Sequence, residues 1–364
     1  MEKPVIRISV RNLVEFILRN GDLESGGTAG DKEAMLKGSR LHRKIQKQMG
    51  SHYQAEVSLK KDTEYEDLIL RVEGRADGIF TQNEKICIDE IKGVYKNLEL
   101  LAEPVLVHRA QALCYAWIYL DDHGLEEIDV QMTYAHLDTE MIKRFRETMT
   151  REELESWYQR LLDSYHKWLS YQMKWREERN RSMEKLEFPF TYRKGQKEMV
   201  AGIYHAISRK EQIFIQAPTG VGKTMSAVFP AVRSIGEGKA ETLFYLTART
   251  ITRTVAQDAF EILRKNGLLF KTVTITAKEK LCFCEKPECN PETCPYAKGH
   301  YDRINDAVYE LWTNEQSFDR ETILRQAEKW QVCPFEMSLE LSVWMDAVIC
   351  DYNYVFDPNV YLKR

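Results

Sequence analysis

The sequence has 364 residues, of which 43% are hydrophobic and 30% charged, and its formal net charge is −4. This composition is typical of a globular protein, the length suffices for two domains with separate cores, and the charge excludes a polybasic coat for nucleic acid. No apolar run reaches the ~18 to 20 residues of a membrane span, and the start MEKPVIRISVRNLVEF lacks a signal peptide's apolar core, so we expect a cytoplasmic protein. In that reducing compartment the eight cysteines are not expected to form disulfides, and the clustering of six in the last quarter indicates a metal site.

The front half contains acidic and basic side chains in a strand pattern. We expect strands at 66–73 and 86–91, joined by a turn at QNEK, and a helix over about 104–121. Because side chains alternate along a strand, Glu90 and Lys92 share one face, whereas Asp89 points to the other face and is the poorer candidate. With Asp77 at the end of the preceding strand, two carboxylates could hold Mg²⁺ or Mn²⁺ while the lysine orients a water. This residue set favours a phosphodiester hydrolase.

Other polar residues extend this pattern in both directions. His42 lies on an expected helix with a cap near Ser39, and Gln111 and Tyr115 are four residues apart on one helical face. The ordered set of His42, G-x-x-D at 74–77, E-x-K at 90–92 and Q-x-x-x-Y at 111–115 resembles the RecB-type nucleases of the PD-(D/E)XK superfamily, over roughly residues 8–185. The resemblance implies that His42, Asp77 and Glu90 coordinate metal, Lys92 activates water, and Gln111 and Tyr115 support the site or the DNA.

One departure from that family concerns cysteine. Several CRISPR-associated relatives carry cysteines for a cluster beside this domain, whereas Cys87 and Cys114 are the only cysteines in the front half. We therefore expect no cluster there.

A long amphipathic helix over about 151–185 leads to a shift in composition, and Pro189 breaks its pattern, so we place a domain boundary near 186. Beyond it, the short apolar segments EQIFIQA (211–217), ETLFYLT (241–247) and DAVIC (346–350) are expected strands that alternate with helices. This alternation predicts an α/β domain with a parallel sheet.

The segment APTGVGKT at 217–224 follows the first of these strands and opens a helix. Its glycines allow backbone N–H groups to surround phosphate, Lys223 reaches the terminal phosphates, and Thr224 can bind Mg²⁺. Ala217 replaces the usual first glycine, and the resulting A-x-T-G-x-G-K-T form resembles superfamily 2 helicases. In that family the matching ATP-binding residues are Gln196 of the Q motif together with Thr219, Gly220, Gly222, Lys223 and Thr224. Motif Ia would place Thr247, Arg249 and Thr250 on the DNA backbone.

The cysteines that follow are spaced Cys282-x6-Cys289-x4-Cys294-x38-Cys333, without the close C-x2-C pairs of common zinc ribbons, so zinc is disfavoured. The insertion, at about 278–340, resembles that of the XPD and DinG iron–sulfur helicases. The resemblance implies that Cys282, Cys289, Cys294 and Cys333 hold a [4Fe–4S] cluster, with Cys284 a rival for one place. Cys350, inside an expected strand, is expected to be a small buried hydrophobe, and aromatic residues such as Tyr296, Tyr301, Tyr309 and Trp312 are expected to be core.

Together these patterns predict an N-terminal PD-(D/E)XK nuclease domain (1–185) followed by a partial RecA-like P-loop domain (186–364) with the iron–sulfur insertion. The implied activity is an ATP-dependent DNA helicase, 5′-to-3′ by resemblance, with Mg²⁺- or Mn²⁺-dependent nuclease activity in DNA repair or replication. Its partners would be ATP and single-stranded or forked DNA, with no membrane and no obligate protein partner.

The end of the chain, VICDYNYVFDPNVYLKR, contains Asp351 but no D-E-x-H motif. We therefore expect Asp351 to neighbour a missing motif and the sequence to be the front part of a larger helicase, which by itself hydrolyses ATP poorly and unwinds nothing. The alternative function is a non-catalytic DNA-binding module that has an inactive nuclease fold, a zinc-bound arm and ATP as a switch.

Overall fold

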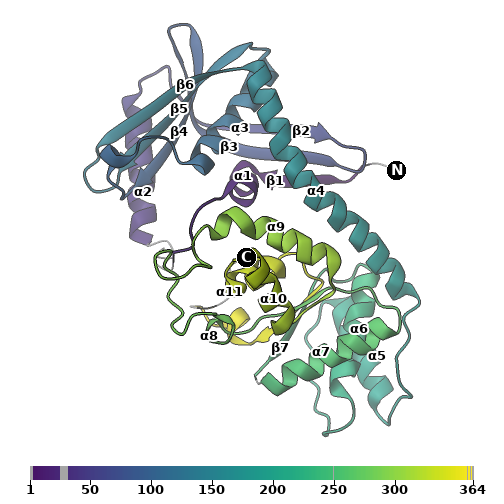
Figure 1. The fold of residues 1–364 in the computed structure, drawn as a ribbon. Coiled ribbons are helices and arrows are strands. Elements are labelled where there is room, and N and C mark those ends of the chain that lie inside the picture. The colour runs from purple at the N-terminus through teal and green to yellow at the C-terminus, as the bar shows by residue number, and fades with distance from the viewer. Residues whose placement is uncertain (1–2, 25–31, 249, 359, 361, 363–364) are drawn as a thin grey trace. The chain divides into compact units, whose positions relative to one another are not determined.

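The computed structural model describes residues 3–24, 32–248, 250–358, 360 and 362 (Figure 1). Contacts divide the chain into two compact units, which are described separately. Unit 1 comprises Met1–Asn20 and Gly26–Ser170, and unit 2 comprises Gly21–Ser25 and Tyr171–Arg364. The division falls inside one long helix, α4 (Arg151–Glu184), which confirms the helix expected over 151–185. The domain boundary near 186 remains a prediction.

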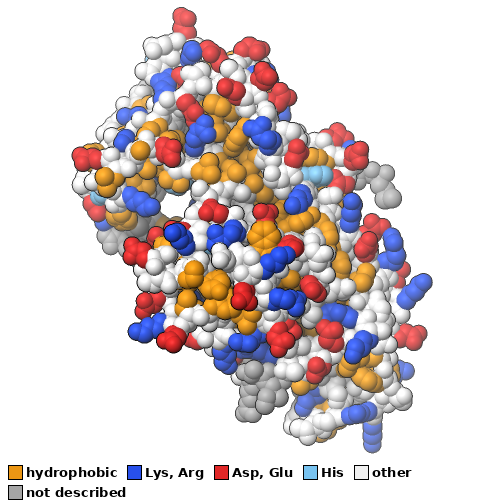
Figure 2. All heavy atoms as spheres, viewed as in Figure 1, with side chains coloured by type: hydrophobic (Ala, Val, Ile, Leu, Met, Phe, Trp, Pro, Cys, Tyr) orange, Lys and Arg blue, Asp and Glu red, His pale blue; other side chains and the backbone are white. Residues whose placement is uncertain are grey.

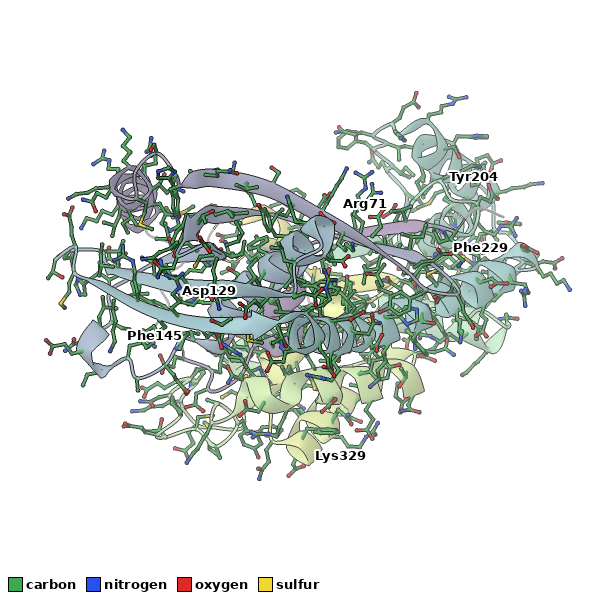
Figure 3. All side chains as sticks on the ribbon, turned by 90° about the horizontal axis from the view of Figure 1, so that it is seen from above. Arg71, Asp129, Phe145, Tyr204, Phe229 and Lys329 are labelled. Atoms are coloured by element: carbon green, nitrogen blue, oxygen red, sulfur yellow. The ribbon has the colours of Figure 1, made fainter. Side chains whose placement is uncertain are left out.

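The described strands of unit 1 form one mixed sheet in the order β1-β3-β4-β5-β6, with β2 on the other edge of β3. The strands are β1 (Val5–Ser9), β2 (Gln54–Glu64), β3 (Ile69–Gln82), β4 (Lys85–Val94), β5 (Glu127–His136) and β6 (Ile142–Thr150). Asp129 on β5 and Phe145 on β6 mark two neighbouring antiparallel strands (Figure 3). The predicted turn is confirmed, because Asn83 and Glu84 join β3 to β4 with φ angles of 51° and 62°, the conformation that tight hairpins require. The strands predicted at 66–73 and 86–91 overlap β3 and β4, but the expectation that Asp77 ends a strand is wrong. β3 continues to Gln82, because it pairs with β2 past this point as far as Ile79.

The helices of unit 1 pack on this sheet. They are α1 (Val10–Leu18), α2 (Lys32–Gln48), the short 3-10 helix η1 (Leu98–Leu100) and α3 (Leu106–His123). The helix α3 contacts β4 and β5, and α2 contacts β4. The predicted helix cap at Ser39 is wrong, because α2 is already helical at Lys32 and the segment before Ser39 contains strong helix formers.

Unit 2 is an α/β unit with the parallel sheet β7-β10-β8-β9. Its strands are β7 (Leu243–Thr247), β8 (Thr272–Thr274), β9 (Ser317–Phe318) and β10 (Ala347–Asp351). Its helices, besides the end of α4, are α5 (Gln196–Arg209), α6 (Lys223–Gly236), α7 (Thr250–Lys265), α8 (Lys278–Leu281), α9 (His300–Asn314), α10 (Arg320–Trp330), α11 (Pro334–Ser342) and α12 (Asn353–Phe356).

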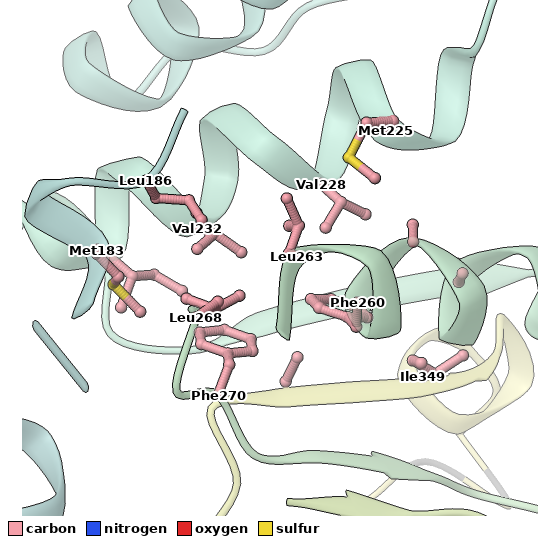
Figure 4. Close-up of a cluster of buried hydrophobic side chains, with 14 residues drawn as sticks. Met183, Leu186, Met225, Val228, Val232, Phe260, Leu263, Leu268, Phe270 and Ile349 are labelled. Atoms are coloured by element: carbon pink, nitrogen blue, oxygen red, sulfur yellow. The ribbon is translucent and has the colours of Figure 1, made fainter. Parts of the chain in front are cut away.

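The main core of unit 2 joins the end of α4 to α6, α7 and β10, as Figure 4 shows. Its buried side chains include Met183, Val228, Phe260 and Ile349. Cys350 is also fully buried in β10, which confirms its assignment as a small core residue.

The strand predicted at 211–217 is wrong. These residues have no regular secondary structure in the described part of the chain, and the side chain of Phe214 is 93% exposed. The physical reason is the lack of a partner strand, since the described pairings of β7 are with β10 alone and an isolated strand leaves its backbone groups unpaired.

Two surface properties complete the description. Basic and acidic side chains are interspersed on the face drawn in Figure 2, as the near-neutral net charge implies. None of the described helices is long and apolar enough to cross a membrane.

Candidate functional site

The first candidate site lies where β3 and β4 separate. Their backbone pairing runs from Gln82 and Lys85 to Gly78 and Asp89. One residue further along β3, the backbone pairing is replaced by a side-chain hydrogen bond, in which Asp77 Oδ2 accepts from the Ile91 backbone N–H at 2.7 Å. The site therefore forms where the backbone pairing of β3 with β4 ends at an acidic residue.

Glu90 and Lys92 lie on one face of β4, as alternation predicts. Lys92 Nζ donates to Glu90 Oε1 at 2.8 Å and to Gln111 Oε1 on α3 at 2.6 Å. The Asp89 side chain is on the opposite face, where it accepts hydrogen bonds from Tyr53, Gln131 and Thr133. The expected orientation of Asp89 is confirmed, and its hydrogen bonds connect it to Tyr53 and to β5.

One carboxylate oxygen of Glu90 has no hydrogen-bond partner among the described residues. This atom is Oε2, which is buried, and the Glu90 side chain is 4% exposed. Burial raises the pKa of Glu90 to about 8, and the neighbouring Asp77 raises it further while Lys92 opposes the shift. Because a buried carboxylate oxygen without a partner is costly, this atom is suited to a bound cation.

Helix α2 contributes two residues of one face to Asp77. His42 Nδ1 lies 3.6 Å from Asp77 Oδ1. Four residues along the helix, Gln46 Nε2 donates to the Asp77 backbone oxygen at 3.0 Å and to Glu56 Oε1 at 3.1 Å. No sequence motif marks Gln46 or Glu56. The one pattern that points to Gln46 is its four-residue spacing from His42, which places both on one helical face.

Glu56 is unusual in its backbone as well. It lies within β2, yet its φ is 58°, a left-handed conformation that non-glycine residues seldom adopt. Strain of this kind is held in place by surrounding contacts, which here include the Arg75 guanidinium, at 2.6 Å from Glu56 Oε2, besides the Gln46 amide.

Tyr115 explains the glycine of the G-x-x-D motif. A Cβ on Gly74 would lie 2.7 Å from the Tyr115 hydroxyl oxygen, so a larger residue would displace the ring. Burial raises the pKa of Tyr115, with Glu90 and Asp77 adding to the shift through their charges. The hydroxyl therefore stays protonated at neutral pH.

The structure thus brings five of the predicted residues together in two sets, His42 with Asp77, and Glu90 with Lys92 and Gln111. The Asp77 hydrogen bond to Ile91 of β4 links the two sets. Tyr115 lies beside Gly74 and within electrostatic reach of both carboxylates. Within the described residues no group of three or more His, Cys, Asp and Glu side chains is already arranged around a single metal ion. The open Glu90 oxygen is the observation that fits a metal.

The second candidate site is the loop before α6. Gly220 and Gly222 have φ angles of 81° and 77°, which glycine adopts without strain. A Cβ on Gly222 would lie 2.6 Å from the Gln196 side-chain nitrogen, so the loop and the Q-motif glutamine are packed together. Lys223 Nζ donates to the backbone oxygens of Ala217 and Pro218 at 2.9 and 3.3 Å.

Arg193, which no sequence motif indicated, contacts both this loop and Gln196. Its guanidinium donates to the Gly220 backbone oxygen, and its backbone N–H donates to Gln196 Oε1 at 3.0 Å. Thr219 is exposed and Thr224 half-buried at the start of α6. The loop therefore offers its backbone and Lys223 to solvent.

The residues of the expected motif Ia are described only in part, and Asp351 is fully described. Thr247 ends β7 and is buried, whereas Arg249 lies outside the described residues and only the backbone of Thr250 is described. Asp351 ends β10, where its Oδ1 accepts the Asn353 backbone N–H at 3.0 Å.

The third candidate site is a small cavity lined by thiols. Its five cysteines are Cys282, Cys284, Cys289, Cys294 and Cys333. None of them is in a disulfide, and the Cys284 and Cys294 sulfurs are 3.7 Å apart. Burial raises the pKa of Cys333 to about 12 and that of Cys284 to about 11.

The chemistry of this cavity fits a thiolate-bound group. Several buried thiols in one cavity become stable anions only when a metal replaces their protons. Cys284 packs in the same buried cluster as Cys289, Cys294 and Cys333. Cys87 and Cys114 are fully buried elsewhere, in unit 1.

Two family models match the second half of the chain. A family model described as DEAD/DEAH box helicase matches residues 193–289, and one described as DEAD_2 matches residues 265–363. Together the two models match residues 193–363. The matched segment contains Gln196, the loop at 217–224 and all five thiols.

Two curated relatives are similar to the chain, the proteins named regulator of telomere elongation helicase 1 homolog of Caenorhabditis briggsae and of Caenorhabditis elegans. They are 22% identical over 223 and 219 residues, which is 49% and 48% of this chain. The aligned part spans 22% of the length of each relative.

Three solved structures were also similar at low scores. The one titled "XPD_Helicase" has a TM-score of 0.31 and 14% identity, covering 47% of this chain and 29% of its own. "Truncated XPD" scores 0.29 at 16% identity (45% and 47%), and "Crystal structure of SSO0001" scores 0.30 at 19% (43% and 75%).

Proposed function

We propose that the chain joins a metal-dependent DNA nuclease, in unit 1, to part of an ATP-driven DNA helicase, in unit 2. The observation that carries the nuclease proposal is the set of contacts that joins two carboxylates, a lysine, a glutamine and a histidine from α2, β3, β4 and α3. One of these carboxylates, that of Glu90, has a buried oxygen without a partner among the described residues. The helicase part is supported by the family matches and by the packing of Gln196 against the phosphate loop.

The proposed roles follow from position. His42, Asp77 and Glu90 would hold Mg²⁺ or Mn²⁺, which supplies Lewis-acid stabilisation of phosphate charge when bound. Lys92, fixed between Glu90 and Gln111, would orient the attacking water and offset negative charge. Tyr115 would keep α3 in register with β3 through its contact with Gly74.

In unit 2, Gln196, Thr219, Gly220, Gly222, Lys223 and Thr224 would bind ATP, with Mg²⁺ at Thr224. A [4Fe–4S] cluster would be held by Cys289, Cys294 and Cys333 with one of Cys282 and Cys284. The packing of Cys284 among the other three favours Cys284 for the fourth place. The complete helicase would act on single-stranded or forked DNA in the 5′-to-3′ direction, in repair or replication.

A second candidate function is a non-catalytic DNA-binding module with a zinc-bound arm. It is favoured by one observation, the separation of 3.7 Å between the Cys284 and Cys294 sulfurs, which is close to the edge of a tetrahedron with ~2.3 Å zinc–sulfur bonds. Metal analysis of the purified protein, which reads iron, sulfide and zinc together, separates the two candidates.

The nuclease proposal is tested with Asp77→Asn and Lys92→Ala in the full chain. Each removes a group placed at the reacting phosphate, so Mn²⁺-dependent cleavage of single-stranded DNA should fall by roughly 10²-fold or more. The matched control is Lys85→Ala on the same strand β4, since Lys85 pairs with Glu127 at the surface and exposed pairs contribute little. Wild-type cleavage in both site variants would contradict the nuclease.

The variant Lys223→Ala distinguishes the nucleotide site from the nuclease site. This variant should lose binding of a fluorescent ATP analogue, because Lys223 is the cation of the loop, while DNA cleavage remains at the wild-type level. Equal nucleotide affinity in the variant and the wild type would argue against the phosphate loop without touching the nuclease.

A further inference from the structure

A short segment from the N-terminal part of the sequence belongs to the thiol-containing unit. We call it the strap, residues Gly21–Leu23; it lies between α1 and α2 in sequence but within unit 2 in contacts. Four hydrogen bonds attach it to the stretch 297–302, just after Cys294. They are Leu23 N to Ala297 O (2.8 Å), Gly299 N to Asp22 Oδ1 (2.6 Å), Gly21 N to Asp302 Oδ1 (2.8 Å) and Tyr301 N to Gly21 O (2.9 Å).

The strap places one apolar side chain on the thiols. Leu23 is 7% exposed and belongs to the same buried cluster as Cys289, Cys294 and Cys333. It lines the thiol cavity together with Tyr296, Ala297 and Pro334. By contrast, its neighbour Asp22 is exposed and serves only as an anchor.

An apolar wall has a defined effect on a thiolate-bound group. The hydrophobic shell around a metal site controls access of solvent and the local dielectric, and residues outside the ligand set change metal retention by ~10- to 100-fold. Thiolates exposed to water are also more readily protonated or oxidised, which releases the metal. A leucine fixed over the sulfurs by backbone hydrogen bonds opposes both processes.

We propose that the strap is a structural part of the thiol site and that Leu23 is the wall that excludes water from the group bound by the cysteines. This inference rests on the proposed thiolate-bound group and applies to an iron–sulfur cluster or a zinc ion alike. Leu23 acts through its neighbours and binds no metal itself. The site is therefore assembled from two distant parts of the sequence, residues 21–23 and 282–333.

The experiment compares full-length wild type with Leu23→Ser and Leu23→Met after anaerobic purification. Metal and sulfide contents are measured first, and then the rate of metal release to a chromogenic chelator in air. Leu23→Ser should release metal about tenfold faster than wild type, because a hydroxyl admits water to the cavity. Leu23→Met, which conserves volume and apolarity, should stay close to wild type.

The matched control is Leu100→Ser, in which a leucine that is 83% exposed receives the same substitution away from the thiols. Equal metal loading with equal release rates in wild type and Leu23→Ser would overturn the role of Leu23 alone. Wild-type protein that neither contains nor takes up iron or zinc would instead overturn the thiolate-bound group, and the inference with it.

A second variant keeps the test decisive if Leu23→Ser fails to fold. Asp22→Ala removes an exposed anchor of the strap without changing the cavity wall. It should speed metal release in the same direction and by a smaller factor, since the strap then detaches more often. Release no faster than in wild type would overturn the proposal.

Discussion

At the residue scale, two elements hold Asp77 in place, the strand β4 and the helix α2. Its carboxylate is held by the Ile91 backbone N–H of β4 and faces His42 of α2, and its backbone oxygen is held by Gln46 of the same helix. The left-handed backbone of Glu56 is part of this arrangement, because Gln46 bonds both residues. Such fixation fits the proposed role of Asp77 as a metal ligand, because a catalytic site requires its groups to be held within about 0.5 Å.

This geometry makes Gln46 a positioning residue for the proposed nuclease. Gln46→Met keeps the volume of the side chain but removes both hydrogen bonds, so we expect the Mn²⁺ concentration for half-maximal cleavage to rise about tenfold while the rate at saturating Mn²⁺ changes less. Titration of cleavage against Mn²⁺ measures the two separately.

The control for Gln46 is Gln48→Met, on the exposed side of the same helix. If Gln46→Met instead lowers the saturated rate and leaves the Mn²⁺ requirement unchanged, Gln46 does not act through the metal ligand.

Residue-level prediction from the sequence succeeded where function dictates side-chain type at a fixed spacing. The alternation of β4 placed Glu90 with Lys92 and excluded Asp89, and the structure confirms both. Gln46 was missed because its contact is with a backbone oxygen 31 positions away, which leaves no pattern in side-chain chemistry. Leu23 was missed for a similar reason, since it is one apolar residue in a polar stretch.

At the element scale, helices and hairpins follow from local sequence patterns, whereas a strand outside a hairpin also depends on a distant partner. Helix α4 and the β3–β4 hairpin were predicted because periodicity and turn residues are local signals. The segment 211–217 has an equally apolar strand-like sequence but no strand in the structure. A strand depends on a neighbour that its own residues cannot reveal.

The second half of α4 is attached to the sheet of unit 2 through Asp346. This carboxylate accepts hydrogen bonds from Trp175 Nε1 (2.9 Å), Arg179 Nη1 (2.5 Å) and the Lys271 backbone N–H (2.8 Å). Beside it, the buried Lys271 ammonium donates to the backbone oxygens of Trp312 and Glu315 and lies 4.1 Å from the centre of the Trp175 ring. Burial lowers the pKa of Lys271 to about 8.

A pH dependence of stability follows from Lys271. Its pKa is lower in the folded state (about 8) than in the unfolded state (~10.4), so the unfolded state binds more protons between these values. The free energy of unfolding should therefore rise with pH across this window, by about 2 kcal/mol from about pH 7.5 to 9.5, and not change through this group at lower pH.

Urea unfolding of wild type and Lys271→Met at several pH values measures this contribution. The difference between the two stabilities should grow in favour of wild type as the pH rises, because methionine has no proton to lose. Parallel pH profiles would show that Lys271 titrates at its ordinary value in the folded protein.

At the scale of the whole molecule, composition and motif order predicted an α/β chain with helicase sequence in its second half, and the family matches over 193–363 agree. They could not predict how the chain is divided into units. The backbone enters unit 2 at Gly21, leaves it after Ser25 and enters it again at Tyr171. Sequence patterns locate a boundary along the chain, and they do not reveal that a short N-terminal segment, the strap, belongs to the second unit.

This path affects any fragment that separates unit 2 from unit 1. A fragment beginning at Tyr171, or at the predicted boundary near 186, contains all five thiols but lacks the strap. We expect such a fragment to lose its metal at the rate of Leu23→Ser, and a fusion that restores residues 21–23 beside 297–302 to recover the wild-type rate. A fragment as retentive as the whole chain would contradict this expectation. No single cut ahead of Tyr171 leaves unit 2 intact, so a gene shortened from its front loses part of unit 2 together with unit 1.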